Sequence, residues 1–332
     1  MIKTNSPTRV DFAGGTLDCW PLHVFVGDCA TVNLSIDVMT GCELETLPTS
    51  EIEVEVTDLH YKKKFKNLTE FLSSSENELK LVQAVVKAYR PEKGFRLKTF
   101  SQSPVGGGLG GSSSLCISLI KAFSKSLNQE LKVYPTVEMA HNIEAEVIHA
   151  PTGTQDYFPA LVPGLNLIHY SARGARLEPL DFDEKFLSSQ LMLVYTGKAH
   201  HSGINNWQVL KEVIEGHAKP LAALKRIAVI SEKMARACRA QDWQMLPELF
   251  HQEFEARVEL SAGFSSPEIE TLRRIVLQGG GDAVKICGAG GGGCVLVWAD
   301  PSKHETLTKE CQKSGFRTIE FQAVRQREPV LL

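Results

Sequence analysis

Residues 103–115 read SPVGGGLGGSSSL, in which five glycines and one leucine fill positions 106 to 111 and three serines follow. The preceding segment GFRLKTF (94–100) alternates apolar and polar residues, as a half-buried strand does, whereas residues 113–127 carry apolar side chains at helical spacing. Glycine lets the backbone approach a ligand closely, and a helix start presents free N–H groups and a positive dipole end. The pattern predicts a strand, a loop and a helix start that binds an anion, with phosphate as the natural occupant.

Two other interpretations of this loop stay open. A glycine-rich turn can cap a helix without binding any ligand. Gly106, Gly108 and Gly111 also match the G-x-G-x-x-G fingerprint of dinucleotide-binding proteins. That fingerprint expects an all-apolar parallel strand before it and an acidic residue about 20 positions later. Here the preceding strand alternates, Pro104 opens the loop and the later position is Ser126, while no Walker sequence G-x-x-x-x-G-K-[ST] occurs anywhere.

Two more glycine-containing segments carry candidate functional residues. KICGAGGGGCVLVW (285–298) lies between two apolar strands, so it is either a hairpin turn or a backbone surface for a ligand presented elsewhere in the protein. SPTRVDFAGGTLD (6–18) places Arg9 and Asp18 on either side of a glycine pair. Taken alone, the segment 6–18 is also consistent with a surface ion pair between Arg9 and Asp11 and with Asp18 as a helix cap.

Composition indicates an ordinary globular protein of about two domains. The 332 residues are 43% hydrophobic and 23% charged, with a net charge of −3, which gives no support for a nucleic-acid partner. Eight cysteines form no C-x-x-C pair and several lie in apolar runs, as reduced thiols of a cytoplasmic protein do. We find no apolar signal region, no stretch of about 18 apolar residues and no zinc motif, so we expect a cytoplasmic protein without membrane contact.

The order of expected elements suggests a division near the middle of the chain. Strands are expected at 51–59 and 94–100 and helices at 113–127 and 136–150, followed by a polar stretch at 171–186 that we interpret as the domain boundary. Beyond it come a strand at 191–195, helices between about 203 and 279, two strands around the second glycine loop, a helix and a last strand. This order is typical of the split βαβ arrangement of ferredoxin-like domains.

The three segments, in this order, resemble the motifs of the GHMP kinase superfamily. The first motif is similar to residues 7–18, the second, roughly P-x-x-x-G-L-G-S-S, to 104–113, and the third to GAGGGG at 288–293. The resemblance implies an α+β fold with an N-terminal domain like ribosomal protein S5 domain 2 (residues 1–180) and a ferredoxin-like C-terminal domain (187–332). It also implies an ATP-dependent kinase that needs Mg²⁺ and phosphorylates a small molecule.

Within the superfamily, the chain looks most like the sugar 1-kinases of the heptose-7-phosphate kinase and fucokinase branch. GTQD at 153–156 and YTG at 195–197 are similar to segments of that branch. Two positions depart from the wider pattern: Gly111 replaces a serine, and Gly15-Thr16 stand where galactokinases carry Glu-His. We therefore expect a free or phosphorylated sugar as substrate and a monomer or homodimer. The alternatives are a non-sugar alcohol such as a mevalonate-like substrate, a catalytically silent ligand-binding member, and, from outside the family, a dinucleotide-dependent oxidoreductase.

The resemblance assigns roles residue by residue. Asp156 is expected to accept the proton of the attacking hydroxyl, with Arg9 beside it, and Ser112 with Glu146 to hold the metal, Glu144 being the alternative that we interpret as a surface charge. The substrate residues are expected to be Asp18, Gly15, Thr16, Gln155, Tyr195 and His200. The ATP-binding residues are expected to be Pro104, Gly106, Gly107, Gly108, Leu109, Gly110, Gly111, Ser112, Ser113, Gly290 and Gly291.

Overall fold

The computed structural model describes residues 1–199 and 202–326 and contains two β-sheets. The larger sheet has the order β4-β3-β5-β2-β6-β7, and β1 pairs with the long central strand β2. Only the pairing of β3 with β5 is parallel among these described strands. The strands of this sheet are β1 (Ile2–Ala13), β2 (Cys29–Thr46), β3 (Ile52–Val56), β4 (Tyr61–Phe65), β5 (Phe95–Ser101), β6 (Leu165–Ser171) and β7 (Gly174–Leu180).

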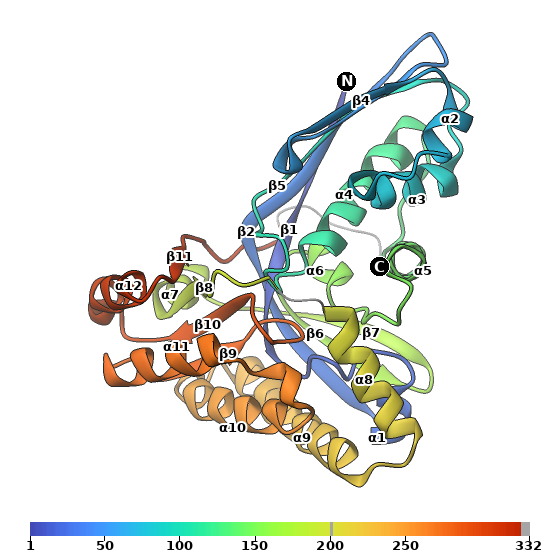
Figure 1. Ribbon diagram of the computed structural model, residues 1–332. Helices are drawn as coiled ribbons and strands as arrows, with labels where there is room; N and C mark the ends of the chain where they lie inside the picture. Colours follow the sequence, from blue (N-terminus) through green and yellow to red (C-terminus); the bar gives the residue numbers. More distant parts are fainter. Residues whose placement is uncertain (200–201, 327–332) are drawn as a thin grey trace.

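One group of helices packs on one face of this sheet around a shared apolar core. The helix that follows the first glycine loop, α4, contributes the buried Cys116, Leu119 and Phe123 to that core. Figure 1 shows this group to one side of the long strands β1 and β2. Its helices are α2 (Leu68–Leu72), α3 (Lys80–Tyr89), α4 (Gly111–Ser126), α5 (Val133–Ile148) and α6 (Tyr157–Leu161).

The smaller sheet has the order β11-β8-β10-β9 and is antiparallel throughout its described pairs. Numbered by their order in the chain, its strands lie 4-1-3-2, which is the split βαβ arrangement expected from the sequence. The strands are β8 (Leu191–Tyr195), β9 (Ala283–Ile286), β10 (Cys294–Trp298) and β11 (Arg317–Ile319). The remaining helices are α1 (Leu22–Val26), α7 (Glu184–Gln190), α8 (Ser202–Ile214), α9 (Ala218–Ala240), α10 (Leu246–Val258), α11 (Pro267–Gln278) and α12 (His304–Lys313).

The two halves of the chain share one core. Val32 and Leu34 of β2, on the face turned away from α4, join Ile227 of α9, Phe250 of α10 and Leu296 of β10 in a single apolar cluster. Helices α9 and α10 therefore cover the second face of the large sheet (Figure 1). This core contains residues from both sides of the expected boundary, so the domain limits 1–180 and 187–332 stay a prediction.

The polar stretch at 171–186 is mostly regular structure, and its place as the domain boundary stays a prediction. β7 occupies residues 174–180 and pairs with β6 along its whole length, and α7 begins at Glu184 with Asp183 as its N-cap. β7 is an edge strand with only Leu177 fully buried, so its sequence ARLEPL is polar enough to resemble a linker. The strand at 94–100 and the helices at 113–127 and 136–150 are confirmed as β5, α4 and α5. Among the described residues, none of the helices combines the length and apolarity needed to cross a bilayer.

Candidate active site

Arg9 of β1 and Asp156, the residue before α6, form an ion pair at the centre of the molecule. Arg9 Nε donates to Asp156 Oδ1 at 2.8 Å, and Nη2 lies 2.6 Å from the same oxygen. The Arg9 side chain is 4% exposed and that of Asp156 is 22% exposed. Burial opposes the charge of Arg9, but Asp156 and Asp11 outweigh it, and the pKa of Arg9 lies above its ordinary value. A permanently charged guanidinium therefore orients a carboxylate that solvent can reach.

The first glycine loop turns its carbonyl groups toward the protein. Gly107 O accepts from the backbone of Cys294 at 2.8 Å, Gly108 O from Arg9 Nη1 at 2.5 Å and Leu109 O from the backbone of Arg9 at 3.0 Å. Gly106, Gly108 and Gly110 have φ values of 63°, 73° and 69°, a left-handed conformation that favours glycine. No described residue accepts from the N–H groups of residues 108–113. Such alternating backbone leaves a concave row of N–H groups, which suits a phosphate.

The metal-binding prediction is wrong for Glu146 as the structure places it. Glu146 is 57% exposed and pairs with Lys87 at 2.5 Å on the outer surface. Glu144 is instead buried beside the start of α4, where Ser113 Oγ and the hydroxyl of Tyr157 each donate to its Oε2 at 2.7 Å. The physical reason is helical register: Glu144 follows the buried Ala140 by four residues, whereas two further residues rotate Glu146 by about 200° away from it.

The residues at the start of α4 fit a magnesium ion. Mg²⁺ prefers oxygen ligands and is commonly held by one carboxylate together with substrate phosphates and water. Glu144 supplies a buried carboxylate and the exposed Ser112 a hydroxyl, next to the row of free N–H groups. Burial raises the pKa of Glu144, although bonds from Ser113 and Tyr157 oppose this. Among the described residues, no group of three or more His, Cys, Asp or Glu side chains is arranged to hold a metal.

Asp18 contacts the residue that precedes Asp156 in the sequence. Its carboxylate is buried and accepts from the backbone N–H of Gln155 at 3.0 Å. The turn fits so closely that a Cβ on Gly153 would lie 1.8 Å from Asp18 Oδ2. Burial and the nearby charge of Asp156 raise the pKa of Asp18 to about 6. Two carboxylates from distant parts of the chain thus face one region.

The expected substrate residues Gly15, Thr16 and Gln155 also meet in this region. A Cβ on Gly15 would contact Gln155 Nε2 and Arg257 Nη2 at 3.2 and 3.1 Å, so the glycine is enclosed by protein. Thr16 Oγ1 lies 3.4 Å from Asn206 Oδ1 of α8. Gln155 Oε1 is buried and has no hydrogen-bond partner among the described residues. It is therefore a hydrogen-bond acceptor that the described residues leave unused.

The second glycine loop connects β9 to β10, and both of its ends contact the first loop, since the backbone of Cys294 donates to Gly107 O. Gly288 lies against Gly108, and its N–H donates to Asp11 Oδ1 at 3.1 Å. A Cβ on Gly290 would lie 2.1 Å from Phe264 O and one on Gly291 2.7 Å from Gly263 O. The structure therefore places the two predicted ATP-binding glycines against the 263–264 turn and brings Gly288 to the phosphate loop instead.

Comparison with known proteins decides the family. Residues 79–164 match the GHMP kinases N terminal domain, and residues 234–315 match the GHMP kinases C terminal domain. The chain belongs to the GHMP kinases. It is therefore an ATP-dependent small-molecule kinase, and both sheets of its fold belong to the two-domain GHMP kinase architecture.

Relatives of this GHMP kinase act on different alcohols. It is 27% identical to the D-glycero-alpha-D-manno-heptose 7-phosphate kinase of Campylobacter jejuni over 98% of this chain and 97% of the relative. It is 24% identical to the mevalonate kinase of Methanocaldococcus jannaschii over 89% and 93% of the two chains. A crystal structure of a D-glycero-D-manno-heptose 1-phosphate kinase from Bacteroides thetaiotaomicron shares the fold with a TM-score of 0.79 and 21% identity, covering 98% and 97% of the two chains.

Two further residues were predicted for the substrate site of this GHMP kinase, Tyr195 and His200. Tyr195 ends β8, where the guanidinium of Arg317 lies 5.5 Å from its ring centre, and it makes no recorded contact with Arg9, Asp18 or Asp156. The substrate role of Tyr195 therefore stays a prediction. His200 lies outside the residues that the structure describes.

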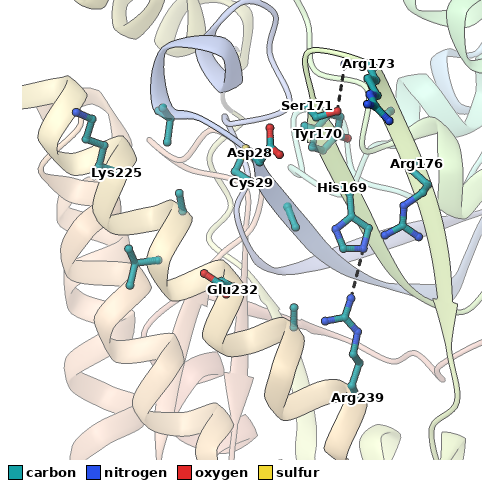
Figure 2. Close-up of a pocket in the computed structure, with 17 residues that line it drawn as sticks. Asp28, Cys29, His169, Tyr170, Ser171, Arg173, Arg176, Lys225, Glu232 and Arg239 are labelled. Atoms are coloured by element: carbon teal, nitrogen blue, oxygen red, sulfur yellow. Dashed lines mark hydrogen bonds between the residues drawn. The ribbon is translucent and has the colours of Figure 1, made fainter.

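A hollow of about 900 Å³ lies away from this site, between α9, the start of β2 and the β6–β7 hairpin. Figure 2 shows His169 and Arg239 in contact at its edge, with Arg239 Nη2 3.4 Å from His169 Nε2. Glu178 pairs with both, at 2.7 Å from His169 Nε2 and 2.7 Å from Arg239 Nε. The hollow contains none of the residues that surround the Arg9–Asp156 pair, so we do not assign the kinase chemistry to it.

The sequence interpretation missed the charged residues behind the site of this GHMP kinase. Asp11 is fully buried and accepts from Lys285 Nζ at 2.8 Å. Burial opposes its ionisation, but Lys285 and Arg9 outweigh burial and hold the pKa of Asp11 below its ordinary value. A partial signal exists in the sequence, because Asp11 is two residues from Arg9 and therefore shares its face of β1.

Proposed function

We propose that this kinase transfers the γ-phosphoryl group of ATP to a hydroxyl of a free or phosphorylated sugar, at the anomeric position. The observation that carries the proposal is the pairing of two carboxylates around one region, the solvent-accessible Asp156 held by Arg9 and the buried Asp18 held by Gln155. Asp156 suits proton transfer, whereas Asp18 suits recognition of hydroxyl groups.

In the proposed reaction, the acceptor hydroxyl lies beside Asp156 and its oxygen attacks the γ-phosphorus. The new P–O bond forms as the bond between the γ-phosphorus and the β,γ-bridging oxygen breaks, and ADP leaves. The hydroxyl proton passes to Asp156, which acts as general base. Arg9 keeps that carboxylate oriented, and its positive charge stabilises the transferring phosphoryl group.

The triphosphate binds at the first glycine loop and the start of α4. The free N–H groups of residues 108–113 and the helix dipole attract its negative charge. Ser112 and Glu144 would hold the magnesium ion, which neutralises charge on the phosphates when it is bound. Arg9 also donates to Gly108 O, so the guanidinium that orients Asp156 supports the phosphate loop too.

Two features favour a polyol over mevalonate as the acceptor. Asp18 is a buried acceptor, and hydrogen bonds from hydroxyl groups to a carboxylate are about twice as strong as neutral ones. Gln155 Oε1 adds an acceptor without a partner among the described residues. Mevalonate carries its own carboxylate, which Asp18 would repel. Similarity to a heptose 7-phosphate kinase along nearly the whole chain supports the same choice.

The test is an ATP-consumption screen across free sugars, sugar phosphates and mevalonate, followed by phosphorus NMR of the product. We expect turnover on a hexose or heptose or its phosphate, with the new phosphorus coupled to the anomeric proton. Asp18→Ala is expected to abolish most sugar-dependent turnover while leaving ATP affinity nearly unchanged. Activity on mevalonate with none on sugars, or a new phosphate on a primary carbon, would refute the proposal.

A further inference from the structure

A chain of buried charges runs from the catalytic pair into the C-terminal half of the protein. Asp11 lies 4.0 Å from Arg9 Nη1 and 2.8 Å from Lys285 Nζ of β9, and Lys285 Nζ lies 3.2 Å from Glu253 Oε2 of α10. Arg257, one turn further along α10, donates through Nε to the other oxygen of Glu253 at 2.8 Å. Arg9, Lys285 and Arg257 are thus balanced by Asp156, Asp11 and Glu253.

Arg257 is the member of this series of buried charges that contacts the Gly15–Thr16 turn, where the acceptor is expected to bind. Its Nη2 donates to the backbone oxygen of Gly15 at 3.1 Å and its Nη1 to Thr16 Oγ1 at 3.4 Å. The side chain is 0% exposed, and its guanidinium carbon lies 5.9 Å from the ring centre of Phe264. Burial opposes its charge, but Glu253 and Asp11 outweigh burial and raise the pKa of Arg257, so the donor fork stays charged.

The contact is made at a closely packed glycine of the turn. A Cβ on Gly15 would lie 3.1 Å from Arg257 Nη2, 3.1 Å from Asp11 Oδ2 and 3.2 Å from Gln155 Nε2. Thr16 follows in a left-handed conformation with φ of 77°, which costs energy in a β-branched residue unless its surroundings hold it. Two residues later comes Asp18. Arg257 therefore holds the strained turn that leads to Asp18, whose carboxylate is expected to bind the acceptor.

Stability alone does not explain these charges. Replacing a buried ion pair by apolar side chains is often neutral or stabilising, because removing two charges from water is costly. The ion pairs instead fix the orientation of Arg257. Its planar guanidinium donates to Glu253 and to the backbone oxygen of Gly15 at the same time, which no apolar side chain can do.

We infer that Arg257 is a positioning residue for the acceptor, which sets the Gly15–Thr16 turn and thereby the place of Asp18 from the C-terminal half of the protein. The inference rests on the proposed function only in placing the acceptor at Asp18. It adds a determinant of acceptor affinity that touches neither ATP nor the reacting atoms. The same series of buried charges also holds the second glycine loop, because the N–H of Gly288 donates to Asp11.

The test compares Arg257→Lys with Arg273→Lys by steady-state kinetics on the alcohol that the ATP-consumption screen identifies. Lysine keeps the charge beside Glu253 but has no planar fork to bond Gly15 as well. We expect Arg257→Lys to raise the KM of the acceptor about tenfold or more, equivalent to about 1.4 kcal/mol, while the KM of ATP changes less than about twofold.

Arg273 serves as the control on the neighbouring helix. Its guanidinium carbon lies 4.6 Å from the ring centre of Phe254, and its Nη2 donates to Glu255 at 2.6 Å, so it has the same kinds of partner as Arg257. Its side chain is 27% exposed and makes no contact with the turn that the structure gives for the described residues. Arg273→Lys should leave both KM values unchanged. Equal changes in both KM values for Arg257→Lys, or no change in either, would overturn the inference.

Thr16→Val leaves Arg257 in place, so it tests the same contact if Arg257→Lys folds poorly, and the two substitutions together form a double-mutant cycle. Thr16→Val removes the hydroxyl that Arg257 contacts and should itself raise the acceptor KM. If Arg257 acts through this turn, the double variant is no worse than the more affected single variant, whereas additive effects would contradict the inference. An acceptor other than a sugar would refute the proposed function, yet the same comparison of KM values would still test Arg257.

Discussion

The carboxylate of Asp18 accepts a hydrogen bond from the backbone N–H of Gln155 at 3.0 Å, although 137 residues separate the two in the sequence. This bond joins the turn after β1 to the turn before α6, which also carries Asp156. In the proposed function, recognition of the acceptor and proton transfer would thus depend on one junction between two loops. The following predictions test the parts of that junction.

Gly153→Ala is expected to weaken acceptor binding. The new Cβ would lie 1.8 Å from Asp18 Oδ2, so the GTQD turn or Asp18 must move. We expect the acceptor KM to rise about tenfold or more in steady-state assays, with a smaller effect on the KM of ATP. Gly203→Ala is the control, since its Cβ would meet Ala150 at an ordinary 3.5 Å. Normal acceptor kinetics in Gly153→Ala would show that this close contact has no role.

Asp156→Asn is expected to lower turnover about a hundredfold or more and to leave ATP binding nearly intact. The amide cannot accept the hydroxyl proton as a carboxylate does, and loss of a general base commonly has this effect. Turnover is measured with saturating substrates and ATP affinity by calorimetry. A purified Asp156→Asn variant with near-normal turnover would exclude Asp156 as the base.

Glu144→Gln is expected to raise the magnesium concentration needed for half-maximal rate, whereas Glu146→Gln is not. Glu144 is buried beside the start of α4, and Glu146 pairs with Lys87 at the surface. Because the Glu144 carboxylate also accepts from Tyr157, Tyr157→Phe serves as the control for lost hydrogen bonding without lost charge. Magnesium titrations in which the two glutamate variants behave alike would contradict this assignment.

The acceptor kcat/KM is expected to rise with pH up to about 6 and then to level off. Asp18 has a pKa of about 6 because of burial and the charge of Asp156, and only its ionised form accepts bonds from two hydroxyl groups. The raised pKa also means that folded protein binds more protons than unfolded protein between about pH 4 and 6, so the free energy of unfolding falls as pH rises through that range.

Asp18→Asn provides the matched comparison for this pH dependence. It should remove the limb near pH 6 from the acceptor kcat/KM profile and flatten the stability curve over the same range. Chemical denaturation at several pH values measures the second effect. A limb that persists unchanged in Asp18→Asn would belong to another group.

Local sequence was sufficient to predict most elements of the fold. The alternating segment at 94–100 and the helical stripe at 113–127 were confirmed as β5 and α4, since hydrophobic period reports directly which face of an element is buried. β7 was missed because an exposed edge strand buries too little to show that period. The choice between Glu144 and Glu146 was open to the same reasoning, since the buried stripe of α5 includes position 144.

The sequence by itself determined where backbone suited to a phosphate occurs, because five glycines before a helix set the local conformation. It also determined the family through three motifs in order. Tertiary structure alone decided which charges are buried together. Glu253 and Arg257 have the spacing of any exposed helix pair, and only the packing of α10 against β1 and β9 places them beside Lys285 and Gly15. The raised pKa of Asp18 has the same origin, since burial and the neighbouring Asp156 are properties of the folded chain.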